Sequence, residues 1–125
     1  MKEPTEKQLS KAFYKRVKIL QAYNQLSQDI LVIHIPNEQV GGKGWTLELL
    51  RMGMVSGTPD YLILIKGGRC GFLEFKRNAK AKMSTNQKVF KSQCDILGIP
   101  HFVVWDIDQA IERLKEMSGK PLVAN

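Results

Sequence analysis

The stretch GTPDYLILIKGGRCGFLEFKR, residues 57–77, decides the fold because it holds two apolar runs on either side of a glycine pair. Residues 61–65 and 71–75 are rich in branched and aromatic side chains, which favour β-strands. The linking residues 66–69, Lys-Gly-Gly-Arg, are typical of a tight hairpin turn. The sequence therefore predicts an antiparallel β-hairpin near the middle of the chain.

Three charged residues stand at the open end of this hairpin. Asp60 precedes the first strand, and Glu74 and Lys76 come at the end of the second. Glu74 and Lys76 are two positions apart, so they project from one face of the strand while Phe75 points to the other. Cross-strand neighbours lie about 5 Å apart, which is close enough for Asp60 and Glu74 to share one metal ion or one phosphate.

The length of the turn decides whether Asp60 joins the other two charged residues. A two-residue turn would set Asp60 opposite Phe75, on the wrong face. A three-residue turn with a bulge would set it opposite Glu74 or Lys76, and a bend at Thr58-Pro59 would have the same effect. We therefore expect an irregularity near one end of the hairpin.

Two carboxylates and a lysine in this arrangement suit metal-assisted hydrolysis of a phosphodiester bond. Neighbouring carboxylates resist being ionised together without a cation, and hard oxygen ligands favour Mg²⁺ or Mn²⁺. A lysine beside them can position an attacking water and offset the charge that grows on a phosphate. The alternative is an exposed ion triad at the strand ends, in which Asp60 is simply a turn residue after Pro59.

The rest of the chain predicts helices and strands around the hairpin, in the order αβαββαβα. Apolar periodicity and turn residues predict helices over residues 6–26, 45–52, 84–98 and 106–117, and strands over 30–35, 61–65, 71–75 and 101–105. Capping-box patterns mark three of the helix starts: Thr5-x-x-Gln8, Ser84-x-x-Gln87 and Asp106-x-x-Gln109. A glycine-rich loop covers residues 37–44. We expect a single α/β domain over residues 1–125, with a mixed sheet flanked by helices.

The composition is that of a basic protein without a membrane segment. The 125 residues include 19 Lys and Arg against 12 Asp and Glu, a net charge of +7. Such an excess commonly accompanies binding to a polyanion, most often nucleic acid, although a basic surface kept for solubility explains it equally well. No apolar run approaches the ~20 residues that cross a bilayer, and the N-terminus lacks the apolar core of a signal peptide. Because Cys70 and Cys94 are isolated, we expect free thiols and a cytoplasmic location, in a bacterium or a phage-infected host.

The charged residues and their flanks resemble a known nuclease signature. Pro59-Asp60, 13 intervening residues and Glu74-Phe75-Lys76 have the form of the PD-(D/E)XK motif. More narrowly, the chain resembles the VRR-NUC family of viral replication and repair nucleases, in its small, single-domain phage form. The supporting segments are IPNE (35–38), RMGMVSG (51–57), TPDYLIL (58–64), GFLEFK (71–76), Asn86-Gln87 and HFVVW (101–105). The implied fold is the restriction-endonuclease-like α/β core, over nearly the whole chain.

The resemblance implies a magnesium site and a set of catalytic residues. Asp60, Glu74 and the carbonyl of Phe75 would ligate Mg²⁺, for which Mn²⁺ would substitute, and Lys76 would be the catalytic lysine. No small-molecule cofactor is implied. The resulting activity is a divalent-metal-dependent endonuclease that leaves 5′-phosphate and 3′-hydroxyl ends.

Two further catalytic candidates come from helices. Glu6 matches a glutamate that members of the superfamily often add from the first helix, with Glu3 as the second candidate; an acid that stabilises a helix N-terminus is the alternative explanation. Gln87 matches the family's glutamine, although its capping box explains it as well. Residues predicted to share its inward face are Phe90, Cys94 and Leu97.

Candidates for nucleic-acid contacts flank the predicted site. They are Arg77, Lys80, Lys82 and Asn37. A solvated basic loop explains the three cations nearly as well, and turn chemistry explains Asn37 and Gly57, both of which match family positions. Family members often continue after the asparagine with glycine and a basic residue, whereas this chain has Glu38 and Gln39.

Similarity to the small family members implies a homodimer acting on branched DNA such as four-way junctions, since two symmetric sites suit two symmetric cuts. The rival hypothesis is a catalytically silent nucleic-acid-binding protein on a nuclease fold, and a third is an assembly or packaging subunit. The intact set of Asp60, Glu74 and Lys76 counts against both, because a retired site has little reason to keep desolvated acids together.

Overall fold

The computed structural model describes residues 3–36 and 42–119, and it confirms the predicted order of helices and strands. The elements are α1 (Glu6–Ala22), β1 (Ile30–His34), α2 (Gly42–Arg51), β2 (Tyr61–Ile65), β3 (Arg69–Phe75), α3 (Thr85–Leu97), β4 (His101–Val104) and α4 (Ile107–Ser118). Within these residues no helix combines the length and apolar character needed to cross a membrane.

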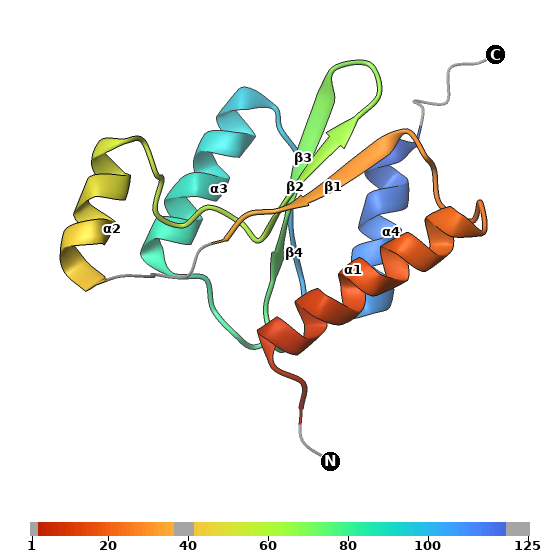
Figure 1. The fold of residues 1–125 in the computed structure, drawn as a ribbon, viewed down its shortest axis with the longest axis horizontal. Coiled ribbons are helices and arrows are strands. Elements are labelled where there is room, and N and C mark those ends of the chain that lie inside the picture. The colour runs from red at the N-terminus through yellow and green to blue at the C-terminus, as the bar shows by residue number, and fades with distance from the viewer. Residues whose placement is uncertain (1–2, 37–41, 120–125) are drawn as a thin grey trace.

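The four strands form one mixed sheet in the order β1-β2-β3-β4. β1 and β3 both run antiparallel to β2, and β4 runs parallel to β3. Helices α1 and α4 cover one face of the sheet and α3 lies on the other, while α2 stands at the outer side of α3 (Figure 1). This confirms the predicted α/β class, a mixed sheet flanked by helices.

The hairpin turn has the length that places Asp60 beside Glu74. Ile65 pairs with Arg69, so the loop between them contains three residues, 66–68. Both glycines of this loop take the left-handed conformation, with φ of 91° and 78°, which side chains with a Cβ rarely adopt. Tyr61 pairs with Leu73, and the next pair outward in the same register is Asp60 with Glu74.

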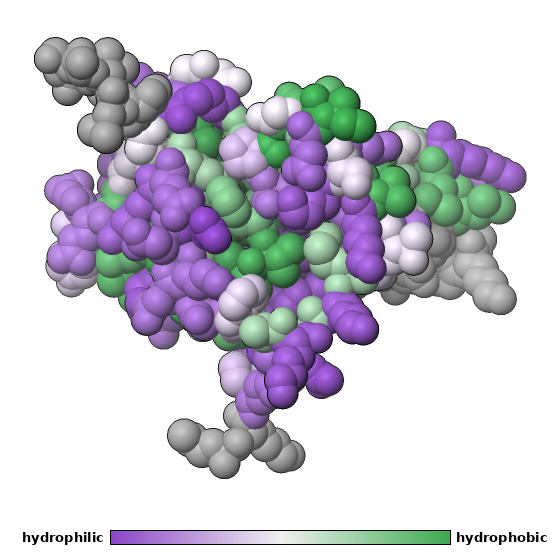
Figure 2. Space-filling model, turned by 180° about the vertical axis from the view of Figure 1, so that it is seen from behind, coloured by the Kyte–Doolittle hydropathy of each residue, from purple (hydrophilic) through white to green (hydrophobic). Residues whose placement is uncertain are grey.

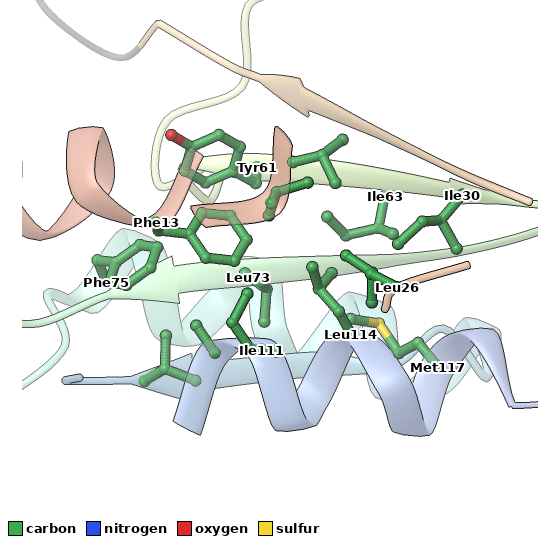
Figure 3. Close-up of a cluster of buried hydrophobic side chains, with 14 of the residues drawn as sticks. Phe13, Leu26, Ile30, Tyr61, Ile63, Leu73, Phe75, Ile111, Leu114 and Met117 are labelled. Atoms are coloured by element: carbon green, nitrogen blue, oxygen red, sulfur yellow. The ribbon is translucent and has the colours of Figure 1, made fainter. Parts of the chain in front are cut away.

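Aromatic side chains form the centre of the core on the α1 side of the sheet. Phe13 of α1 packs against Tyr61 and Phe75, with ring centroids 5.1 and 5.2 Å apart respectively (Figure 3). Phe13 and Phe75 are both fully buried. Burying an apolar side chain of this size contributes about 1.5–3 kcal/mol. Because Phe75 is anchored in this core, its strand neighbours Glu74 and Lys76 must face the other side of the sheet.

The first helix ends four residues before the predicted limit of 26. α1 stops at Ala22, and Asn24 takes a left-handed conformation with φ of 56°. Asparagine tolerates this conformation better than most residues, so it reverses the chain as glycine commonly does after a helix. Leu26, predicted to be helical, is instead buried in the core from the following turn.

Other boundaries shift by a few residues, while the predicted caps are confirmed. The second helix begins at Gly42 and ends at Arg51, so it takes up part of the predicted loop; residues 37–41 lie outside the described residues. Thr5 and Ser84 each make both hydrogen bonds of a capping box. At α4, the Gln109 N–H donates to Asp106 over 2.7 Å, but the Gln109 side chain accepts from the N–H of Trp105.

A buried histidine makes the stability of the fold depend on pH. His101 is 5% exposed, and neither ring nitrogen has a hydrogen-bond partner among the described residues. Burial lowers the pKa of His101 below its ordinary value of 6.5. The unfolded chain therefore binds the proton more readily, so this residue destabilises the fold as pH falls below about 6.5.

We expect His101→Leu to remove this dependence. As pH falls below 6.5, the difference in free energy of unfolding between the variant and the parent should grow in favour of the variant by up to about 1.4 kcal/mol per pH unit. Urea unfolding of both proteins over a pH series measures the gap, and other titrating groups cancel in the difference. Two parallel curves would contradict the assignment.

Candidate active site

Asp60 directly precedes β2, where hydrogen bonds from two main-chain N–H groups fix its position. Its Oδ2 accepts from the N–H of Phe75 over 2.7 Å, so the side chain extends the ladder beyond the last strand pair. The Asp60 carbonyl accepts from the N–H of Ile35, also over 2.7 Å. The aspartate is thus tied to both neighbouring chain segments, and its remaining Oδ1 is not used by either bond.

Glu74 is a buried carboxylate with one oxygen unpartnered. The residue is 3% exposed on β3. Its Oε2 accepts from the side-chain amide of Gln87 over 3.3 Å, whereas Oε1 has no hydrogen-bond partner among the described residues. A buried polar atom without a partner carries a desolvation cost of about 1–3 kcal/mol, so its presence needs a physical explanation, such as an ion or a water bound there.

Lys76 is held by the same glutamine. Its backbone N–H donates to the Val104 carbonyl over 2.8 Å, which continues the parallel ladder with β4. Its Nζ donates to Gln87 Oε1, also over 2.8 Å. That oxygen additionally accepts from the Ser84 N–H over 2.9 Å. Gln87 therefore closes the capping box of α3 and also holds the Lys76 ammonium, while its catalytic role stays a prediction.

Burial and mutual repulsion raise the pKa values of both carboxylates. Desolvation is the largest cause for Glu74, followed by the charge of Asp60, and together they raise its pKa to about 8 against the partial opposition of Lys76. The pKa of Asp60 is raised by burial, although the Phe75 N–H opposes the shift. Such a pair favours a cation in its vicinity, because a cation relieves both causes at once.

Glu6 stands at the edge of this group and not within it. It is exposed in the first turn of α1, where it lines a hollow together with Asp60. Its negative charge raises the pKa of both Asp60 and Glu74. Glu3 instead accepts a hydrogen bond from the side chain of Asn78 over 2.6 Å, which ties the N-terminal segment to the loop after β3.

The predicted nucleic-acid contacts lie on the loop that follows Lys76. Arg77, Lys80 and Lys82 are exposed there. The Asn78 side chain shapes this loop, because its Oδ1 accepts from the N–H groups of Lys80 and Ala81 over 2.9 and 2.8 Å. Three more residues complete the outcome of the sequence predictions. Asn37 lies outside the described residues. Cys94 is buried on the predicted inward face of α3, but the same prediction is wrong for Leu97, which is 72% exposed in the last position of the helix.

The same arrangement of helices and strands occurs in a solved structure described as a VRR_NUC domain. The two superpose with a TM-score of 0.58 and 22% sequence identity, over 90% of this chain and 97% of the other. The chain has the fold of a VRR_NUC domain. No protein-family model and no curated protein matches the sequence.

The donors at this end of the VRR_NUC fold suit a hard divalent cation. Within residues 3–36 and 42–119, no group of three or more His, Cys, Asp and Glu side chains is placed to hold a metal ion. Two carboxylates and a main-chain carbonyl would leave several positions to water, which is how Mg²⁺ is commonly held. The unpartnered Glu74 Oε1 is the observation that favours such an ion. The residues present therefore fit a magnesium or manganese site.

Three residues near the site escaped the sequence analysis. His34 ends β1 and lies beside Tyr61, with ring centroids 5.2 Å apart, and its charge lowers the pKa of Asp60. The Tyr61 hydroxyl donates to the Ser10 carbonyl over 3.1 Å and lies 2.7 Å from the Ser10 hydroxyl. The antiparallel pairing of β1 with β2, had it been predicted, would have placed His34 near Asp60.

Gly57 allows α3 to approach the site in the VRR_NUC fold. It has φ of 81°, and a Cβ built on it would lie 2.3 Å from the backbone carbonyl of Asn86 and 2.6 Å from the nitrogen of Gln87. No real side chain tolerates such distances to main-chain atoms. A glycine is therefore required for Gln87 to reach Glu74 and Lys76.

We expect Gly57→Ala to displace the start of α3 and disrupt the site. The matched control is Gly53→Ala, because Gly53 has φ of 106° but a Cβ added there would meet nothing within 4 Å. Both variants carry backbone strain of about 1–3 kcal/mol, but only Gly57→Ala should also lose the Gln87 contacts. Thermal unfolding together with amide hydrogen exchange at the first turn of α3 measures the difference. Equal losses of stability in the two variants would show that the close approach of α3 to Gly57 does not matter.

Proposed function

We propose that this chain is a VRR-NUC nuclease that hydrolyses phosphodiester bonds in DNA with Mg²⁺ or Mn²⁺. The observation that carries the proposal is the buried Glu74, whose unpartnered Oε1 lies in a site shared with Asp60 and Lys76. The desolvated pair of acids is costly to the fold, which suggests a functional reason for it. The fold shared with a VRR_NUC domain supports the same conclusion.

Each residue has a role that follows from its position. Asp60, Glu74 and the carbonyl of Phe75 would hold the metal ion, which when bound supplies Lewis-acid polarisation of the phosphate and a lowered pKa for water. Lys76, fixed by Gln87, directs its ammonium group toward the acids, where it orients the attacking water and offsets charge growing on the phosphate. Glu6 would assist from the rim.

DNA is the proposed substrate because the chain is basic and a loop with three cationic residues lies beside the candidate site. The chain carries a net charge of +7. Arg77, Lys80 and Lys82 lie on the loop that begins after Lys76, where they would contact the phosphates beside the scissile bond. Phosphate contacts of this kind position a strand without selecting its sequence. The preferred substrate we propose is branched DNA, such as a four-way junction.

The test is cleavage of labelled four-way-junction, flap, single-stranded and linear duplex DNA. Each substrate is incubated with Mg²⁺, Mn²⁺ or EDTA, using the parent protein and an Asp60→Asn variant purified in parallel. We expect cutting in both metals, no cutting in EDTA and none by the variant. Faster cutting of the junction would support the branched substrate.

Two outcomes would overturn parts of this proposal. Tight DNA binding without cutting in either metal would favour a catalytically silent binding protein on the same fold. Equal rates on all four substrates would leave the nuclease intact but exclude structure selectivity.

We also propose that the nuclease acts as a homodimer, with α2 in the interface. The described part of the chain shows no extensive packing of α2 on another helix or strand. Exposed apolar residues on α2 and the segment after it are Leu47, Leu50, Met52, Met54 and Val55. Hydrophobic residues also gather on this side of the molecule in Figure 2. An apolar patch of this kind commonly marks an interface, and two copies would provide two cuts.

We expect Leu50→Glu to convert a dimer into a monomer, because a charge would be buried at an apolar contact. The matched control is Ile19→Glu on α1, since Leu50 and Ile19 are similarly exposed at 42% and 45%. Sedimentation equilibrium over a range of concentrations measures both variants and the parent. A parent that stays monomeric, or a dimeric Leu50→Glu variant, would contradict the proposed interface.

A further inference from the structure

A groove runs between α1 and the edge strand β1 and opens at the candidate active site. It has a volume of about 870 Å³ and is lined by residues of both elements, which lie side by side in Figure 1. Asp60 and Glu6 line it at one end, so an occupant of the groove reaches Asp60 of the candidate site. None of the roles assigned above uses the rest of this groove.

The α1 wall of the groove carries a row of lysines. Lys7, Lys11 and Lys15 all line it, and all three are exposed. A spacing of four residues places them on one side of the helix, with about 6 Å between successive positions along its axis. In the described residues none of the three forms an ion pair. Their charge is therefore available to an anion in the groove.

The opposite wall and the floor are largely apolar. Val32 and Tyr61 come from the sheet, and Tyr14 of α1 lines the groove between the lysines. Tyr14 is 38% exposed, and the Lys18 ammonium lies 5.3 Å from the centre of its ring. Apolar and aromatic surface beside a row of cations is the combination that binds unpaired nucleic acid, because bases stack on rings while phosphates meet the ammonium groups.

We propose that this groove binds a single strand of DNA that continues from the scissile phosphate. The phosphates lie along Lys7, Lys11 and Lys15, and a base packs against Tyr14. A volume of this size is typical of sites that hold one small molecule, so it suits a few nucleotides of one strand. The inference rests on the proposed function, since the strand leads to Asp60, one of the proposed metal ligands.

A groove that binds one strand gives a physical reason why the protein would prefer branched DNA to intact duplex. A four-way junction or flap supplies a strand that leaves its partner, whereas intact duplex does not. The loop of Arg77, Lys80 and Lys82 would contact the strand on the other side of the cut, so the two basic surfaces have separate roles.

The test compares two double variants with the same change in charge. Lys11→Gln with Lys15→Gln removes two groove lysines and leaves Lys7 beside the acids. The control, Lys66→Gln with Lys115→Gln, removes two exposed lysines on the hairpin loop and on α4. Binding to labelled oligothymidylate is measured by fluorescence anisotropy in EDTA, which prevents cutting, over a series of salt concentrations.

We expect the groove variant to bind about tenfold more weakly and the control to bind like the parent. The slope of log affinity against log salt should fall in magnitude by about 1.4 for the groove variant, because each lost phosphate contact on a single strand contributes about 0.7. Tyr14→Ala should weaken binding about tenfold without changing the slope, since stacking involves no counterion release.

Other outcomes separate this inference from the proposed function. Equal slopes for the groove variant and the control would overturn the groove, even if the parent cuts DNA in Mg²⁺. Weaker binding to duplex but unchanged binding to oligothymidylate would also overturn it. A parent protein that neither binds nor cuts any DNA would overturn the nuclease and the groove together.

Discussion

Replacing Lys76 with alanine is expected to lower the rate of DNA cleavage by about 10³-fold while DNA binding persists. Lys76 is 7% exposed and its ammonium is fixed by Gln87, so its position beside the acids is set before substrate arrives. Truncation removes a preorganised positive charge that would stabilise the transition state more than bound DNA. Single-turnover cleavage in Mg²⁺ and anisotropy in EDTA measure the two properties separately.

Lys66→Ala is the matched control, because Lys66 is an exposed lysine on the hairpin loop at the opposite end of β2. It should cut DNA at the parental rate. Lys76→Arg should recover little, since a planar guanidinium cannot take the place of a compact ammonium on Gln87. Cleavage by Lys76→Ala at the parental rate would exclude the lysine from catalysis and show that other residues carry out the reaction.

Replacing Glu74 with glutamine is expected to abolish metal-dependent cleavage and to stabilise the metal-free fold. The glutamine has the same shape, can still accept from Gln87, and would present its amide to Asp60 without a buried charge. Relief of one buried, unpartnered carboxylate oxygen is worth about 1–3 kcal/mol, which corresponds to a rise of several degrees in Tm for a chain of this length. Thermal unfolding in EDTA measures the gain.

The sign of the pH dependence distinguishes this explanation from a general improvement in packing. The pKa of Glu74 is about 8 in the fold against an ordinary value of 4.5, so the folded state holds the proton more tightly than the unfolded chain. The parent therefore loses stability as pH rises from 4.5 toward 8, and Glu74→Gln should not share this loss. The gain from the variant should be greatest above pH 8.

Exposed Glu112 of α4 provides the control, since Glu112→Gln makes the same change in charge away from the site. It should alter neither cleavage nor the pH profile. Mg²⁺ should raise the Tm of the parent and of Glu112→Gln but not that of Glu74→Gln, because only the first two retain both carboxylates. A Glu74→Gln protein that is less stable than the parent at high pH would refute the explanation that the buried Glu74 carboxylate destabilises the metal-free fold.

Local rules were enough to predict the element order and the faces of the hairpin. Side chains alternate between the two faces of a strand, so Glu74 and Lys76 were predicted to lie on the face opposite Phe75. The glycine pair indicated that a three-residue loop was possible. Capping boxes at Thr5 and Ser84 depend on residues three apart, so the sequence shows them directly. These features require no knowledge of distant contacts.

Contacts between distant segments could not be predicted in this way. Gly57 meets the start of α3 nearly 30 positions later, and nothing in the local sequence indicates that approach. The groove along Lys7 and Lys15 exists only because β1 lies beside α1, whereas the sequence shows no more than lysines away from an apolar stripe. The early end of α1 coincides with one left-handed asparagine, and the apolar pattern of the sequence does not indicate where the helix stops.

The Gln87 side chain has one further consequence, for the motions of the protein. A single amide oxygen of Gln87 accepts from the Ser84 N–H, which closes the first turn of α3, and from the Lys76 ammonium, so displacing this side chain breaks both contacts. Fraying of a helix end is among the least costly local openings of a native protein. Here such an opening would release Lys76 and remove the donor to Glu74 in the same event. Under the proposed function, the local unfolding equilibrium of one helical turn would therefore set the fraction of molecules in which Lys76 is held in place for catalysis.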